Sequence, residues 1–102
     1  MGWRLSIEEV KDIVIDSLKS VADFDPSDSS ILIYPFSHLN DFHKKVFLTK
    51  LKYQIINTKK SGNCYNIALD EGMFNDWLTV SGCIEYVYDN QEYVQLQNKI
   101  KV

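Results

Sequence analysis

The chain has 102 residues, of which 45% are hydrophobic and 25% are charged, and its formal net charge is −3. This length fits a single domain covering residues 1–102 and is too short for two independent cores. No apolar run approaches the ~20 residues that span a bilayer, so we expect a cytoplasmic protein that does not act at a membrane. The acidic balance also argues against binding to nucleic acid.

The N-terminal segment has the pattern of an amphipathic helix that begins after Ser6 and ends near Ser20 or Val21. Ser6 can cap a free backbone N–H, and Glu9, three residues later, completes a capping box. Apolar residues at three- and four-residue spacing then predict one buried face. These residues are Ile7, Val10, Ile13, Val14, Leu18 and Val21.

Residues 23–30 are predicted to form a loop, because Pro26 interrupts a helix and the Asp and Ser side chains satisfy turn backbone. The loop carries Asp23, Asp25 and Asp28. It is either a solvated turn or an acidic contact surface for a basic partner. A calcium loop would need a glycine at the bend and a distal glutamate, which this segment lacks. Residues 31–34 are predicted to form a short buried strand that Pro35 ends.

The main β prediction rests on residues 47–55, where apolar or β-favouring side chains alternate with polar ones. A period of two places Lys50, Lys52 and Gln54 on the solvated face of a strand. The core face would consist of Phe47, Thr49, Leu51, Tyr53 and Ile55. Residues 37–45 lack this alternation, and a helical turn capped by Ser37 or Asn40 is one interpretation of them.

Further strands are predicted on both sides of the ambiguous segment 70–78, which is either a short helix or a connecting loop. A turn at 57–63 forms a hairpin with a strand at 64–69. Residues 79–88 are predicted as a strand, 89–92 as a turn, and 93–102 as a C-terminal strand. The predicted fold class is therefore α+β, with the N-terminal amphipathic helix packed on an antiparallel sheet of four or five strands.

No motif assigns a catalytic residue, a metal site or a cofactor, so we do not expect an enzyme. Cys64 and Cys83 are too few and too far apart for a disulfide framework or a zinc site. They are predicted to be ordinary buried thiols, although one bridge could form in an oxidising compartment if their strands are neighbours. Four glycines leave no room for a phosphate-binding loop.

The helical segment 7–21, the motif Asn40-Asp41-Phe42-His43 and the segment 77–87 together resemble an acyl carrier protein. The resemblance implies an all-helical bundle that carries phosphopantetheine on a serine. Asp41 occupies the position of that serine here, and the nearby Ser37 has a different downstream spacing.

A helix followed by a four-stranded antiparallel sheet resembles small bacterial ribonucleases and toxin domains of the barnase and RelE kind. This resemblance implies RNA cleavage, with His38 and His43 as general acid and base and Lys44 binding the phosphate. It is the alternative to the binding function below. Two histidines at this spacing are also common on surfaces.

Charge is segregated along the chain: residues 38–60 contain six lysines and one aspartate, whereas both flanks are acidic. A compact acidic domain without catalytic motifs favours a protein-binding module. The first hypothesis is a bacterial immunity or antitoxin protein that neutralises a basic nuclease toxin by charge complementarity. The expected contact residues are Asp23, Asp25, Asp28, Asp70, Glu71 and Asp76. A third hypothesis is a structural subunit that forms a homodimer through the edge strand at 93–102.

Overall fold

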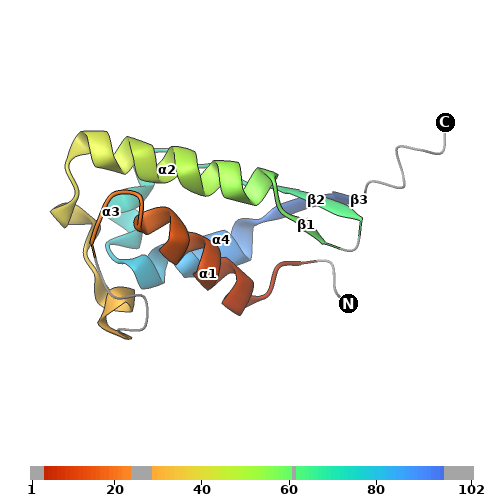
Figure 1. Cartoon of the computed structure of the whole chain (residues 1–102), viewed down its shortest axis with the longest axis horizontal. Coiled ribbons are helices and arrows are strands. Elements are labelled where there is room, and N and C mark those ends of the chain that lie inside the picture. The colour runs from red at the N-terminus through yellow and green to blue at the C-terminus, as the bar shows by residue number, and fades with distance from the viewer. Residues whose placement is uncertain (1–3, 24–28, 61, 96–102) are drawn as a thin grey trace.

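The computed structural model describes residues 4–23, 29–60 and 62–95. Helix α1 packs against both α2 and α4, the small sheet lies at one end of these helices, and α3 lies at the other end (Figure 1). The elements in chain order are α1 (Ile7–Leu18), the 3₁₀ helices η1 (Ser29–Ile33) and η2 (Phe36–His38), α2 (Asp41–Ile56), β1 (Lys59–Lys60), β2 (Asn63–Asn66), α3 (Met73–Trp77), α4 (Val80–Asn90) and β3 (Glu92–Gln95).

The predicted sheet of four or five strands is wrong. The part of the chain that the structure describes is mostly helical, and its one sheet has three short antiparallel strands in the order β1-β2-β3. The hairpin predicted between residues 47–55 and 64–69 is wrong in its first strand, because residues 47–55 belong to α2. The hairpin that does form pairs Lys59–Lys60, from within the predicted turn, with β2, and places Lys59 opposite Cys64. The sheet therefore closes one end of a helical core and does not form a layer beneath it.

Helix α1 confirms the predicted start and most of the predicted face. The Ser6 side chain accepts a hydrogen bond from the Glu9 N–H at 3.1 Å, and the Glu9 carboxylate accepts from the Ser6 N–H at 2.8 Å. Ile7 was expected inside but lies at the surface, because the buried face is turned toward the contacts with α2 and α4. The side chains buried along α1 are Val10, Val14, Ile15, Ser17 and Leu18.

The strand predicted at 47–55 is the second half of helix α2. The prediction failed because Phe47, Leu51 and Ile55 are four residues apart, which fits both a period of two and a turn of about 3.6 residues. Burial of Leu48 fits the helix alone. Thr49, expected in the core, is exposed.

The strand predicted at 79–88 is also a helix, α4, and the strand predicted at 31–34 is the 3₁₀ helix η1. The buried residues of α4 recur at helical spacing: Val80, Cys83, Ile84 and Val87. Helices α3 and α4 approach closely at Gly82, where a Cβ would lie 2.2 Å from the Trp77 carbonyl oxygen. Within the described residues, the connection between η1 and η2 has one β pairing, an isolated antiparallel bridge between Pro35 and Thr79.

Segment 70–78 contains the short helix α3, the first of the two predicted alternatives. Phe74 and Trp77 are buried, whereas Leu78 is 65% exposed. Leu78 ends the helix with a φ of 62°, a left-handed backbone conformation that turns its side chain away from the core. Phe36 contacts Phe74 and Trp77 with ring centroids 5.0 and 5.9 Å apart, so α3 closes an aromatic core.

The predicted C-terminal strand is confirmed for Tyr93–Gln95, which belong to β3, while residues 96–102 lie outside the described residues. Strand β3 pairs with β2, with Cys64 opposite Val94, and lies at an edge of the sheet. No helix in the described ranges is long and apolar enough to span a membrane.

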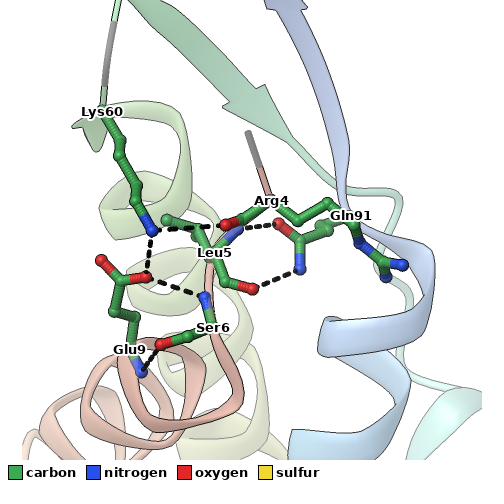
Figure 2. Close-up of polar contacts among 6 residues, drawn as sticks. All are labelled: Arg4, Leu5, Ser6, Glu9, Lys60 and Gln91. Atoms are coloured by element: carbon green, nitrogen blue, oxygen red, sulfur yellow. Dashed lines mark hydrogen bonds and ion pairs between the residues drawn. The ribbon is translucent and has the colours of Figure 1, made fainter. Parts of the chain in front are cut away.

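The segment before α1 is held by polar contacts from two other elements (Figure 2). The Gln91 side chain accepts a hydrogen bond from the Leu5 N–H at 2.7 Å and donates to the Leu5 carbonyl at 3.1 Å. Lys60 reaches from the hairpin to the Glu9 carboxylate at 2.7 Å. The Arg4 guanidinium donates to the Tyr88 carbonyl and lies over the Tyr88 ring. These contacts join the chain start, the hairpin and the end of α4.

Candidate protein-binding face

The acidic residues predicted to bind a partner are divided between two segments. Asp23 is exposed after the end of α1, while Asp25 and Asp28 lie outside the described residues. Asp70, Glu71 and Asp76 are exposed before and within α3. The Asp70 carboxylate accepts a hydrogen bond from the Gly72 N–H at 2.8 Å, so it already closes its own turn.

Asp70 also acts on a neighbouring phenol. The Tyr86 hydroxyl donates a hydrogen bond to the Ala68 carbonyl at 3.0 Å. Burial raises the pKa of Tyr86, and the negative charges of Asp70 and Glu92 raise it further. The raised pKa favours the protonated phenol that makes this bond.

The histidines and lysine considered for ribonuclease chemistry are directed to different contacts. His38 packs edge-on against Tyr34 with ring centroids 5.6 Å apart. His43 lines a hollow with Asp23 at the end of α1, whereas Lys44 lies over the Phe74 ring at 5.7 Å and lines a separate hollow. The geometry therefore does not direct the His43 imidazole and the Lys44 ammonium at one substrate phosphate.

The remaining groups considered from the sequence belong to three different elements. Asp41, which matches the serine position of acyl carriers, is the first residue of α2. Cys83 is buried, and burial raises the pKa of its thiol, which keeps it in the weakly nucleophilic protonated form. Cys64 is a partly buried free thiol in β2. No group of three or more His, Cys, Asp or Glu within the described ranges could hold a metal ion.

Helix α2 carries a second apolar row, which we call the outward stripe. The Asn40 side chain caps the helix by accepting from the His43 N–H at 2.7 Å. From the first turn onward, apolar and threonine side chains recur every three or four residues on the side opposite the buried row. The outward stripe consists of Phe42, Val46, Thr49, Tyr53 and Ile56.

Four of the five residues of the outward stripe are solvent-exposed, and the fifth, Val46, is half-buried. Phe42 and Tyr53 are 68% and 63% exposed, and Ile56 is 42% exposed. Single exposed apolar residues are ordinary on a protein surface, but a continuous row along one helix is typical of an interaction site. Helix α2 runs along one side of the molecule (Figure 1), and the exposure of Phe42, Tyr53 and Ile56 shows that the outward stripe faces solvent.

Two hollows of about 340 and 380 Å³ adjoin the outward stripe. Both are lined by Thr49 and Tyr53, so the two hollows adjoin at these side chains. Lys45 and Lys50 line the first hollow, and Lys52 lines the second. The surface thus combines an apolar centre with ammonium groups at its borders, the composition expected of a protein-binding site for a partner with acidic borders.

Sequence reasoning missed the outward stripe because it treated residues 47–55 as a strand. That assignment put Thr49 and Tyr53 into the core and left Phe42 in a separate helical turn. The signal that could have revealed the stripe is the three- and four-residue spacing from Phe42 to Ile56, which is visible once the segment is treated as one helix.

Comparison of the chain with models of known protein families, with curated proteins and with solved structures found no match.

Proposed function

We propose that this protein is a protein-binding module that contacts its partner through the outward stripe of α2. The observation that carries the proposal is the exposed row from Phe42 to Ile56, opposite a fully formed buried row on the same helix. Water contact at this row costs free energy that burial against a partner would recover, at about 25 cal/mol per Å² of apolar area. Aromatic residues such as Tyr53 are also enriched among the residues that dominate interface energies.

Site-specific crosslinking tests this function. The photoreactive amino acid p-benzoylphenylalanine replaces Tyr53 in the tagged full-length chain, which is irradiated in lysate of its own organism. We expect one discrete crosslinked protein, which disappears when Val46→Asp and Ile56→Asp are added. The control position is Ile33, which is 71% exposed on η1 but outside the stripe. Identical products from both positions, or no product from position 53, would contradict the proposal.

Inhibition of a basic nuclease toxin is a second candidate, favoured by the exposed carboxylates around α3. Glu71 and Asp76 are both exposed, whereas the Asp70 carboxylate is engaged with the Gly72 N–H. Acidic groups at an interface mainly accelerate encounter and make it sensitive to salt. Glu71→Lys and Asp76→Lys should slow association with the partner protein identified by crosslinking, when measured at low salt, and should leave folding unchanged. Unchanged association rates would remove these residues from the interface.

A further inference from the structure

We propose that the segment occupying the outward stripe is an acidic amphipathic helix of the partner protein. This inference rests on the proposed function and specifies the chemistry of its partner. A helix lying along α2 would place its apolar side chains on the stripe and its carboxylates beside the bordering lysines. Helix-in-groove recognition of this kind is read by anchors at three- and four-residue spacing, the same spacing that the stripe shows.

Charge at the borders selects an acidic occupant. Lys50 lies on one side of the stripe, and Lys45 and Lys52 lie on the other, as the helical period places them. The only carboxylate on α2 is that of Asp41, in its first turn. A basic partner would meet ammonium groups on both borders, whereas an acidic one would form ion pairs at the rim that steer its approach.

Shape selects a helix with protruding side chains. The two hollows share Thr49 and Tyr53 as lining residues, so an occupant that fills both needs two sets of side chains spaced along α2. From Phe42 to Ile56 the stripe is about 21 Å long, which equals about four turns of a partner helix. A bilayer surface offers no side chains that could fill the two hollows.

Binding of designed peptides tests the inference. The probe is a fluorescein-labelled leucine–glutamate peptide with an amphipathic pattern of about four turns. One comparison peptide has the same composition in scrambled order, and a second has lysine in place of each glutamate. Fluorescence anisotropy should show binding of the acidic amphipathic peptide alone, with an affinity that falls as salt increases.

Charge reversal on the protein supplies the matched control. Lys50→Glu and Lys52→Glu together should weaken peptide binding about tenfold or more, because both change the border charge of the stripe. Lys59→Glu reverses one charge, as each of those two substitutions does, at an exposed position on β1 outside the stripe, and should change the affinity less than about twofold. Circular dichroism and urea unfolding confirm that the variants remain folded.

Several results would overturn the inference. They are no binding of the acidic peptide, equal binding of the scrambled or lysine peptide, and equal loss from Lys59→Glu. Tyr53-dependent flotation with phosphatidylserine vesicles would identify a membrane as the occupant. Tyr53-dependent dimerisation in sedimentation equilibrium would identify a second copy of the chain.

The two proposals fail in distinguishable ways. A crosslink from position 53 to a partner segment that is neither acidic nor helical would overturn the acidic-helix inference and leave the binding function standing. No crosslink from that position would remove the binding function itself. A crosslink that maps to an acidic amphipathic helix supports both.

Discussion

Helices α1 and α2 pack against each other, yet they distribute their apolar side chains differently. Helix α1 has one apolar face and an opposite side of carboxylates such as Asp12 and Asp16, which is the usual pattern of a surface helix. Helix α2 has two apolar rows, one buried and one exposed. The first helix meets the requirements of the fold alone. The second carries apolar residues that the fold does not use, and this excess is what points to a partner.

The largest expected effect is the loss of stability from a substitution in the buried row of α2, compared with a substitution in the outward stripe. Leu51 is completely buried, so Leu51→Ala should lower the free energy of unfolding by about 2–5 kcal/mol, because it removes core contacts and leaves a cavity. Tyr53→Ala, two residues away on the outward stripe, should change it by less than about 0.5 kcal/mol. Urea denaturation measures both. Similar losses from the two variants would mean that the outward stripe serves folding.

The next effect tests how α1 is anchored at its beginning. Gln91→Leu removes the amide that bonds both backbone groups of Leu5, leaving a buried N–H and a buried carbonyl unpaired. We expect a loss of about 1–3 kcal/mol in the free energy of unfolding. The neighbouring Asn90→Ala removes an exposed bond to the Tyr86 carbonyl and is the control, with an expected loss below about 0.5 kcal/mol. Equal losses would show that Leu5 does not depend on Gln91.

A smaller effect concerns the start of α2. Asn40→Ala removes the hydrogen bond to the His43 N–H and should cost about 1 kcal/mol, whereas Asn40→Asp preserves an acceptor and should retain most of the stability. Because Phe42 lies in the first turn, fraying there should also disturb the outward stripe. Faster amide hydrogen exchange at residues 43–45 would report this fraying. Unchanged exchange in Asn40→Ala would show that the cap is dispensable.

The sequence was informative where local chemistry determines structure. The capping box of Ser6 and Glu9 marks the start of α1 without reference to the rest of the chain, and the turn at Gly62 marks the hairpin. Tyr65 and Ile67, in the strand predicted at 64–69, are both buried, although β2 ends at Asn66.

Helices α2 and α4 were missed for a physical reason. Where apolar residues are four apart, as at Leu51 and Ile55, strand and helix predict the same burial, and β-branched and aromatic residues then favoured the strand. In α4 the row from Val80 to Val87 fitted only a helix, but the alternation of Ile84, Tyr86 and Tyr88 obscured it. Which of the two rows of α2 faces inward depends on contacts with α1 and β2, and these lie outside any local pattern.

The smallest expected effect is a difference in how the stability contributed by the two helix caps depends on pH. These caps are the Ser6–Glu9 capping box of α1 and the Asn40 cap of α2. The hydrogen bond from Lys60 is the main cause that lowers the pKa of Glu9 below its ordinary 4.5, and the bond from the Ser6 N–H adds to it. A carboxyl whose pKa is lower in the folded state stabilises the fold above its unfolded pKa, and this contribution is lost as the pH falls through the folded pKa. Because Glu9 and Lys60 are partly exposed, the contribution should not exceed about 1 kcal/mol.

Lys60→Met tests this contribution, because it preserves the length of the side chain and removes its charge. Its stability should fall below that of the unmodified chain at pH 7, and the difference should shrink toward pH 3. An NMR titration should show the pKa of Glu9 moving back toward 4.5, with a remaining depression from the Ser6 N–H. The cap of α2 uses the neutral amide of Asn40, so Asn40→Ala should cost the same at both pH values. A stability difference for Lys60→Met that stays constant with pH would show that Lys60 acts through packing and not through the charge of Glu9.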